Sequence, residues 1–511
     1  MQLDRRICDR ARKSRDARFD GKFFIAVTST RIYCRPICPA RSPKDENIRY
    51  YPTAAAAQAA GFRPCLRCRP EASPGTPAWL GTSGVVSRAL RLITEGALDR
   101  EGVDALADRL GVTARHLRRL FVQHLGATPI DVALTRRIHF AKKLLDETRL
   151  PISDVAFAAG FGSLRRFNGE IRRTYSRTPT ELRRRARGRV EQGERYQFRI
   201  AYRPPYDWDA VIAFLAARAT PGVERVEDGR YARTIAIGDH SGTISVSHAA
   251  DGAALLLDVR FPDPRALLTI VERVRRMFDI GADPAVIAEQ LSIDPLLKRA
   301  LAMHPGIRTP GAWDPFELSV RAILGQQISV SAATTIAGRV AERWGSRVES
   351  GEWVEAGQLL GRLFPIPAQL AEAPLEEAGI IGTRAASLRA LAQAVLGGAI
   401  CFDGVNTVDA LQTIPGIGEW TAQYVAMRAL SEPDAFPSGD LVLRRMAGDC
   451  SARELDRRSD AWRPWRAYAV MLLWQAARDV DELQRRTPHA KVVSGRGSDR
   501  PRRVAARAAL G

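Results

Sequence analysis

The sequence has few cysteines and no long hydrophobic run. Seven cysteines in 511 residues, an odd number, do not suit the disulfide framework of a small secreted protein. No apolar stretch approaches the roughly 18 to 20 residues that a membrane helix needs, and the N-terminal residues MQLDRRICDRARK contain no apolar signal-peptide core. We therefore expect an intracellular, cytoplasmic protein that does not span a membrane.

The sequence also has fewer acidic than basic residues. The chain has 57 acidic residues against 77 lysines and arginines, a formal net charge of +20 and a sequence pI near 10.3. A cationic surplus of this size attracts polyanions. The charge therefore predicts a nucleic acid as partner, with an anionic membrane surface as the alternative. The length predicts two to four domains rather than one.

Four of the cysteines form two closely spaced pairs. The stretch YCRPICPA holds Cys34 and Cys38, and FRPCLRCRP, after a spacer of 26 residues, holds Cys65 and Cys68. Thiolates at these spacings can close a tetrahedral zinc site with Zn–S bonds near 2.3 Å. A reducing compartment disfavours a disulfide framework. Spacing alone favours a purely structural zinc knuckle, and a reactive thiol site is the alternative.

The next segment contains an internal repeat. LADRLGVTARHLRRLFVQHLGATP (106–129) and VAFAAGFGSLRRFNGEIRRTYSRTP (155–179) share an alanine, a glycine turn, a basic helix and Thr-Pro in the same order. Gly111 and Gly160 stand where one helix must end and turn sharply into the next. Each copy therefore predicts a helix-turn-helix.

The second helix of each unit is expected to face DNA. Arginine and asparagine read guanine and adenine edges, although contact with a phosphate is the commoner use of any single arginine. The predicted DNA-facing residues are Arg115, His116, Arg118, Arg119, Ser163, Arg165, Arg166 and Asn168. The opposite stripe, predicted to be core, comprises Leu117, Leu120, Phe121, Phe167 and Ile171.

The C-terminal half begins with strand-like runs and continues as helices. YQFRIAY, RTIAIGD, GTISVSH and ALLLDVRF are separated by turns, and helical periodicity begins at about residue 283. LQTIPGIGEWTAQYVAMRAL (411–430) contains a helix-hairpin-helix turn, in which Gly416 and Gly418 let backbone N–H groups approach a DNA phosphate. Twenty-two residues after Gly418, FPSGDLVLRRM places Asp440 at the start of another helix, where a carboxylate can face the bound strand.

Residues 1–72 resemble the N-terminal domain of Ada-type methylphosphotriester DNA methyltransferases. The resemblance rests on FDGKF, FFIAVTSTRIYCRPICPAR and ENIRYYPTAAAAQAAGFRPCLRCRP. It implies one zinc ion held by Cys34, Cys38, Cys65 and Cys68, with Cys34 accepting a methyl group from a methylated DNA phosphate. Methylation would change the net charge of a four-thiolate zinc centre from −2 to −1, so DNA affinity is expected to rise. Arg31 stands where a small residue, usually glycine, is expected.

Residues 83–187 resemble the AraC-type DNA-binding domain, whose two helix-turn-helix units enter successive major grooves. The resemblance implies sequence-specific transcriptional activation, with RNA polymerase as a partner.

Residues 195–485 resemble AlkA-type 3-methyladenine DNA glycosylases. The resemblance rests on the hairpin motif and on PPYDWDAVIAFLAARATPGVERVEDGRYART, DPFELSVRAILGQQISVSAA and RPWRAYAVMLLWQAA. It implies that Asp440 supports cleavage of the N-glycosidic bond, by stabilising the oxocarbenium-like sugar or by positioning water. The implied base pocket, in which electron-rich rings favour a flipped cationic base, is formed by Trp420, Tyr424 and Trp474.

Two further positions are implied to contact DNA, and one neighbour departs from the pattern. Gln326 and Gln327 of LGQQIS are expected at the DNA, with Gln327 in the place of an apolar wedge that fills the gap left by the flipped base. Gly439 stands where an acidic residue is expected just before Asp440.

Three absences narrow the chemistry. Bifunctional relatives carry a lysine at the position of Trp420, so no Schiff base and no strand incision are expected. Relatives with an iron–sulfur cluster carry four cysteines after this region, but only Cys450 follows Asp440, so no cluster is expected. The Pro-Cys-His-Arg site of a second methyltransferase is missing, so O6-methylguanine repair is not expected.

The sequence thus predicts a multidomain α+β protein. Its parts are a small zinc-bound α/β domain, an all-helical double helix-turn-helix domain, and a small antiparallel sheet followed by a helix-hairpin-helix glycosylase body. The expected divisions are 1–72, 83–187, 195–282 and 283–488, with a disordered basic tail over 489–511. We expect a monomer that senses backbone methylation, activates alkylation-response genes and excises damaged bases. The alternative is a methylation-sensing activator whose glycosylase part is an inert DNA-binding module.

Overall fold

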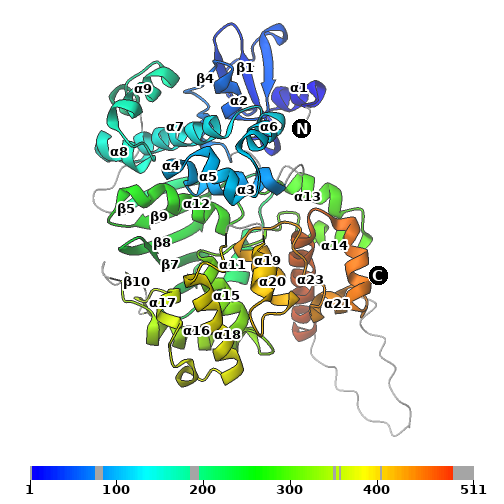
Figure 1. Cartoon of the computed structure of the whole chain (residues 1–511). Coiled ribbons are helices and arrows are strands. Elements are labelled where there is room, and N and C mark those ends of the chain that lie inside the picture. The colour runs from blue at the N-terminus through cyan, green and yellow to red at the C-terminus, as the bar shows by residue number, and fades with distance from the viewer. Residues whose placement is uncertain are drawn as a thin grey trace.

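The computed structural model describes residues 3–74, 84–184, 195–348, 353–355, 358–402 and 406–486. The predicted tail over 489–511 lies outside the described residues. The N-terminal and helix-turn-helix domains lie at one end of the molecule, a five-stranded sheet lies in the middle, and a helical body lies at the other end (Figure 1). The expected multidomain α+β architecture is confirmed.

The N-terminal domain is built on a four-stranded sheet of order β3-β1-β2-β4. Because β2 and β4 pair in parallel, Tyr33 lies opposite Pro64, and the two cysteine pairs, which begin at the last residue of β2 and just after β4, meet at the same end of these strands. The helices and strands are α1 (Arg5–Ser14), β1 (Phe24–Val27), β2 (Ile32–Cys34), β3 (Ile48–Tyr51), α2 (Ala54–Ala59) and β4 (Arg63–Pro64), with 3-10 turns at Ala17–Phe19, Asp45–Asn47 and Pro70–Ala72.

Residues 84–184, the next described part of the chain, form eight helices. They are α3 (Gly84–Thr94), α4 (Ala97–Arg100), α5 (Val103–Arg109), α6 (Ala114–Leu125), α7 (Pro129–Glu147), α8 (Ile152–Ala158), α9 (Leu164–Tyr175) and α10 (Pro179–Arg183). Gly111 turns α5 into α6 and Gly160 turns α8 into α9, both with left-handed backbones (φ +67° and +81°). The Thr-Pro of each repeat begins a helix, since Thr128 and Thr178 each form a capping box with the acidic residue three positions on. The two predicted helix-turn-helix units are confirmed.

The predicted core stripe of these units is largely correct. Leu117, Phe121, Phe167 and Ile171 are buried. Leu120 is only partly buried, because it packs at the edge of the first unit's core rather than inside it.

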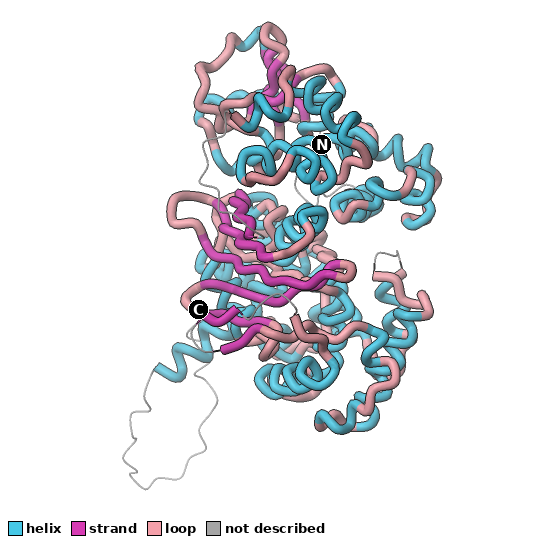
Figure 2. Tube along the Cα trace, turned by 90° about the vertical axis from the view of Figure 1, so that its left-hand side faces the viewer, coloured by secondary structure: helices cyan, strands magenta, loops and turns pink. Residues whose placement is uncertain are grey.

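The central sheet is antiparallel, with order β5-β9-β8-β7-β6, and its strands lie side by side in the middle of the molecule (Figure 2). Four strands match the four predicted runs. The fifth, β6, is an edge strand of four residues that the sequence analysis missed because it is too short to show alternation. The elements are β5 (Arg195–Ala201), α11 (Trp208–Ala216), β6 (Glu224–Glu227), β7 (Arg230–Ile237), β8 (His240–His248), β9 (Ala254–Arg260), a 3-10 turn (Pro264–Ala266) and α12 (Leu267–Met277).

Over the residues from 284 onward that the structure describes, the body is helical apart from one short β-hairpin, formed by β10 and β11. The helix-hairpin-helix turn lies between α19 and α20, and α21 and α23 follow it. The elements are α13 (Pro284–Leu291), α14 (Pro295–Met303), α15 (Pro315–Leu324), α16 (Val330–Trp344), β10 (Trp353–Glu355), β11 (Gln358–Leu360), α17 (Pro367–Leu370), α18 (Gly382–Leu396), α19 (Thr407–Gln412), α20 (Glu419–Ala429), α21 (Leu441–Met446), α22 (Ala452–Ser459) and α23 (Arg466–Arg486), with 3-10 turns at Leu375–Ala378 and Asp460–Trp462.

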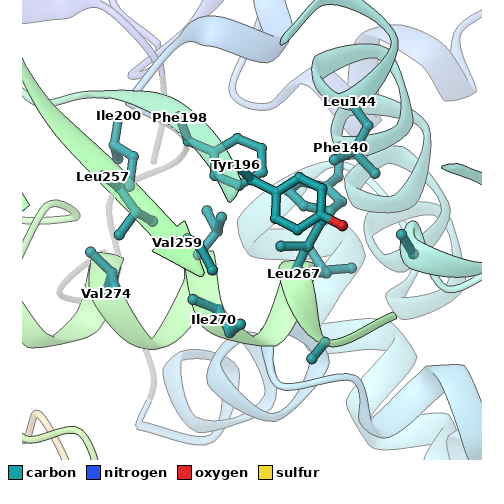
Figure 3. Close-up of a cluster of buried hydrophobic side chains, with 14 of the residues drawn as sticks. Phe140, Leu144, Tyr196, Phe198, Ile200, Leu257, Val259, Leu267, Ile270 and Val274 are labelled. Carbon is teal, nitrogen blue, oxygen red and sulfur yellow. The ribbon is translucent and has the colours of Figure 1, made fainter. Parts of the chain in front are cut away.

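The second helix-turn-helix unit and the central sheet share one hydrophobic core. Phe140 and Leu144 of α7 pack toward Tyr196 and Phe198 of β5, and α12 completes the cluster with Leu267 (Figure 3). The rings of Phe140 and Phe198 are 6.2 Å apart between centroids. Burial of apolar surface therefore holds the helix-turn-helix domain and the C-terminal half together. The sequence of the linker between them does not indicate this packing.

Candidate functional sites

The sulfur atoms of Cys34, Cys38, Cys65 and Cys68 all lie within 4.8 Å of one another. Cys65 and Cys68 are buried, whereas Cys34 and Cys38 are half-buried. In a tetrahedral site with 2.3 Å bonds the sulfurs would be about 3.8 Å apart. Among the described residues, no other group of three or more His, Cys, Asp and Glu side chains comes together in this way.

The charge balance of this cluster also fits a metal dication. Without a cation the four thiols cannot all ionise, because like charges at this separation repel. Hydrogen bonds with Cys38, Cys65 and Cys68 raise the pKa of Cys34, and the hydrogen bond from Cys34 lowers the pKa of Cys38 to about 7. A dication would stabilise all four thiolates at once. The donor set therefore fits zinc.

The two residues that flank Cys34 make specific contacts. The hydroxyl of Tyr33 is 3.0 Å from Nε2 of His139 on α7. The backbone N–H of Arg35 donates to Sγ of Cys68 at 3.4 Å, and its guanidinium forms an ion pair with Asp20. These contacts hold the cysteine-bearing loop on both sides.

Arg31 adopts the backbone conformation that a glycine would supply. Its φ is +55°, in the left-handed region that side chains rarely enter. The guanidinium lies over the ring of Phe62, 5.3 Å from its centroid. The cation therefore packs on an aromatic face of the same domain, which compensates part of the backbone strain.

The predicted DNA-facing residues lie on α6, α9 and the cap of α9. Arg115, Arg118, Arg119, Ser163, Arg165 and Arg166 are exposed, and His116 and Asn168 are half-buried. Nη2 of Arg119 is 3.0 Å from Nδ1 of His116. The hydroxyl of Ser163 accepts a hydrogen bond from the backbone N–H of Arg166 at 3.2 Å, so Ser163 is also the helix cap.

Asp440 begins α21 as its N-cap residue and is half-buried. Its Oδ1 accepts hydrogen bonds from the backbone N–H groups of Val442 and Leu443, each at 3.0 Å. Nε1 of Trp420 donates to Oδ2 at 3.0 Å, and Nε1 of Trp474 donates to Oδ1 at 3.2 Å. The structure thus brings together three residues that the sequence separates by up to 54 positions.

The predicted pocket aromatics form a continuous set. Trp420 stacks on Tyr424 with centroids 5.2 Å apart and planes 7° apart. Tyr424 contacts Trp474 at 6.3 Å and 48°. Tyr424 therefore covers one face of the Trp420 ring.

A buried arginine behind these rings was missed by the sequence analysis. Arg428 donates to the hydroxyl of Tyr424 at 2.8 Å and to the carbonyl oxygen of Gly311 at 3.2 Å. Burial alone would raise the pKa of Tyr424, but Arg428, Arg218 and Arg321 outweigh it and lower the pKa. The spacing of Tyr424 and Arg428 on one helix, four residues, was the only local signal.

Gln326 joins the loop after α15 to the helix-hairpin-helix turn. Its side-chain nitrogen donates to the carbonyl oxygen of Gly416 at 2.8 Å and to the hydroxyl of Thr421 at 3.0 Å. Gln327 is exposed, with a left-handed φ of +57°. Gly416 has φ +87°, and a Cβ there would lie 2.4 Å from Oγ of Ser387, so this turn requires glycine. Gly418 is the N-cap residue of α20, and Gly439 is exposed beside Asp440.

Family models match all four folded parts. The metal binding domain of Ada matches residues 7–71, a helix-turn-helix domain matches 106–185, the AlkA N-terminal domain matches 197–314, and the HhH-GPD superfamily of base excision DNA repair proteins matches 320–461.

One relative spans nearly the whole chain. The probable bifunctional transcriptional activator/DNA repair enzyme AlkA of Mycobacterium tuberculosis is 43% identical over 486 residues, which cover 93% of this chain and 97% of that protein. The chain belongs to this AlkA family. It is a fusion of an Ada-type metal-binding domain, a helix-turn-helix regulator and an AlkA-type glycosylase, which confirms the predicted resemblance.

Two further relatives each match one part of this AlkA-family chain. DNA-3-methyladenine glycosylase 2 of Escherichia coli is 33% identical over 285 residues, 54% of this chain and 96% of that protein. The bifunctional transcriptional activator/DNA repair enzyme AdaA of Bacillus subtilis is 32% identical over 168 residues, 33% of this chain and 77% of that protein. No described helix of the AlkA-family chain is long and apolar enough to cross a membrane.

Proposed function

We propose that this chain repairs alkylated DNA and controls the response to it. Cys34 takes a methyl group from DNA methylphosphotriesters, the paired helix-turn-helix units activate transcription at specific sites, and the glycosylase hydrolytically excises N-alkylated purines such as 3-methyladenine. The observation that carries the glycosylase part is the carboxylate of Asp440, held by the indole N–H groups of two pocket tryptophans. An inert third domain, the alternative, is not favoured by relatives that are named as repair enzymes.

In the methyl transfer, a sulfur–carbon bond forms at Cys34 while a carbon–oxygen bond of the phosphotriester breaks. The phosphate leaves as an ordinary phosphodiester anion, and the thiolate becomes a thioether. Zinc, when bound by the four cysteines, supplies the positive charge that keeps them deprotonated near neutral pH. A thioether does not give the methyl group back, so each molecule reacts once.

In base excision, the C1′–N bond breaks and its electron pair leaves with the base. An N-alkylated purine is already cationic, so it departs neutral without an acid. Positive charge then develops on the sugar, and the Asp440 carboxylate opposes it in a water-poor site. Water adds at C1′. Trp420 stands where a bifunctional enzyme has lysine, which supports a monofunctional reaction without strand cleavage.

The same proposal fixes the partners. We assign double-stranded DNA, both damaged and promoter DNA, to the exposed arginines of α6 and α9 and to the hairpin turn. RNA polymerase is the proposed partner in activation. The protein is proposed to act as a monomer in the bacterial cytoplasm, on nucleoid DNA, with one zinc ion and no iron–sulfur cluster.

The decisive experiment measures release of free 3-methyladenine from methylated duplex DNA by the intact chain and by Asp440→Asn, at matched DNA binding. We expect release by the intact chain and a loss of at least 100-fold in the variant, as is usual when a key electrostatic group is removed. Asp456→Asn makes the same change at an exposed position of α22 and should act like the intact chain. DNA binding without release by the intact chain would favour the inert-module alternative.

A second measurement tests the methyl acceptor. Mass spectrometry after exposure to methylphosphotriester DNA should find one added methyl group on the peptide that contains Cys34. The Cys34→Ser variant should gain none at this position. An unmodified Cys34 in a zinc-loaded chain would leave the cluster with a structural role alone.

A further inference from the structure

The carboxylate of Asp440 is surrounded by donors from three helices. Two backbone N–H groups of α21 and the indole of Trp474 from α23 all donate to Oδ1. The indole of Trp420 from α20 donates to Oδ2. A helix cap needs only the backbone contacts. The two indole donors therefore exceed what the local structure of α21 requires.

The two tryptophans that donate to Asp440 are also connected to each other through Tyr424. Trp420 packs on Tyr424, Tyr424 packs on Trp474, and both tryptophans return to the same carboxylate. Arg428 fixes the hydroxyl of Tyr424 from behind. The rings and the carboxylate are therefore one mechanical unit, in which the position of each ring limits the orientation of Asp440.

We propose that Trp420 and Trp474 are positioning residues for Asp440 in addition to stacking residues for the base: their indole N–H groups fix the rotation of its carboxylate. This proposal rests on the catalytic role of Asp440 proposed above. An indole nitrogen is a donor only, so each tryptophan can offer one hydrogen bond and no competing acceptor. Hydrogen bonds to an ionised carboxylate are the strong kind.

The two oxygens of the carboxylate then have different tasks. Oδ1 accepts three hydrogen bonds, which use both of its lone pairs. Oδ2 takes one donor, from Trp420, and is the oxygen left to face the sugar. Because the rotation is fixed, the negative charge is already in place when positive charge develops, and no reorganisation is needed at that moment. Trp420 and Trp474, which would stack on the flipped base, thus also orient the negative charge of Asp440.

The test removes the N–H but keeps the ring. Replacing Trp420 or Trp474 by 3-benzothienylalanine, through amber suppression, puts sulfur in place of N–H in an aromatic system of the same shape. We expect single-turnover release of 3-methyladenine to fall roughly 10- to 100-fold in each, the effect of losing a hydrogen bond to a charged group. Affinity for duplex DNA with a tetrahydrofuran abasic analogue should stay within about twofold, since the phosphate contacts remain.

The same replacement at Trp208 is the matched control. Its indole also donates a hydrogen bond, to the carbonyl oxygen of Gly229 at 3.2 Å, but it lies on α11, outside the pocket. Release should be unchanged there. In the Asp440→Asn background, the replacements at Trp420 and Trp474 should have little further effect, because the indoles act through the carboxylate.

These variants distinguish failure of the positioning role from failure of the proposed function. Full release by the benzothienyl variants, together with a large loss in Asp440→Asn, would overturn the positioning role and leave the proposed catalytic aspartate intact. Normal release by Asp440→Asn would overturn the proposed function itself. Equal losses in rate and in abasic-site binding would assign the two indole N–H groups to DNA binding and would overturn the positioning role.

Discussion

The residues around Cys34 are held in place by contacts with residues that lie far away in the sequence. Tyr33 and Arg35 flank Cys34, the proposed methyl acceptor, and each contacts a different partner: Tyr33 contacts His139 of α7, and Arg35 forms an ion pair with Asp20. The carbonyl oxygen of Asp20 accepts a hydrogen bond from Arg203, which is fully buried beside the central sheet. Cys34 therefore lies between residues whose contacts lead to the helix-turn-helix domain and to the C-terminal half.

His304 gives a prediction about pH at this scale. Its Nδ1 is 2.8 Å from Asp207 and its Nε2 is 2.8 Å from Asp479. The hydrogen bond with Asp207, joined by that with Asp479, raises the pKa of His304 although burial opposes it. A raised pKa in the folded state means that the stabilisation is present below the unfolded value, about 6.5, and is lost as pH rises through the folded value.

This prediction is tested by measuring the urea concentration at the midpoint of unfolding at several pH values between 6 and 9. The intact chain should lose on the order of 1 kcal/mol of stability over this range through His304. His304→Gln should lose stability at pH 6 and show a flatter profile, while His240→Gln, an exposed histidine, should keep the profile of the intact chain. Identical slopes in all three proteins would rule out the ion-paired imidazolium.

Elements are positioned here by turns and by buried ion pairs between layers. Arg233 of β7 bonds Glu317 of α15 at 2.7 Å, and Arg321 of the same helix bonds Glu224 of β6 at 2.7 Å. These side chains are almost fully buried apart from Arg321, so each charge depends on its partner. They fix the sheet against α15, and Gln326 in turn connects the end of α15 to the hairpin.

The two helix-turn-helix glycines allow a matched comparison of turns. Both have left-handed backbones, so an alanine at either costs about 1–2 kcal/mol. At Gly111 a Cβ meets open space, but at Gly160 it lies 3.1 Å from Oδ2 of Asp99, which pairs with Arg136 and Arg137. Gly160→Ala should therefore destabilise the protein more than Gly111→Ala, and should weaken promoter binding more. Equal losses in thermal unfolding would contradict the role given to Asp99.

On the scale of the whole molecule, the N-terminal domain is docked on the C-terminal half. Lys22 forms an ion pair with Asp283 at 2.6 Å, with side chains only 12% and 7% exposed. Arg203 adds the hydrogen bond to Asp20, and the shared apolar core joins α7 to the sheet. Damage sensing and base excision therefore reside in one docked body, and the domains are expected to unfold together.

A charge exchange tests this docking. Lys22→Asp and Asp283→Lys should each cost about 3–5 kcal/mol, since each leaves a buried charge beside a like charge, and should split the calorimetric transition. The double exchange, Lys22→Asp with Asp283→Lys, should recover much of the loss. Lys13→Asp changes an exposed pair with Asp45 in the same domain and should cost less than about 1 kcal/mol. Failure of the double exchange to recover stability would show that the pair does not hold the interface.

The sequence by itself determined the parts. Cysteine spacing, the repeated Gly turn and the Ile-Pro-Gly-Ile-Gly hairpin are short patterns whose chemistry depends on neighbours within a few residues. They can therefore be recognised in the sequence, and the domain types were predicted correctly. The candidate residues Cys34, Asp440 and Trp420 were found in the same way, through motifs that resemble known families.

Only the tertiary structure decided how these parts act on one another. The strand β6, the partial exposure of Leu120 and the arginine behind Tyr424 depend on packing rather than on local pattern. The contacts of Tyr33 with His139 and of Asp20 with Arg203 join residues more than 100 positions apart. No periodicity or spacing encodes such pairs, because their free energy comes from desolvated polar groups that meet only after the chain has folded.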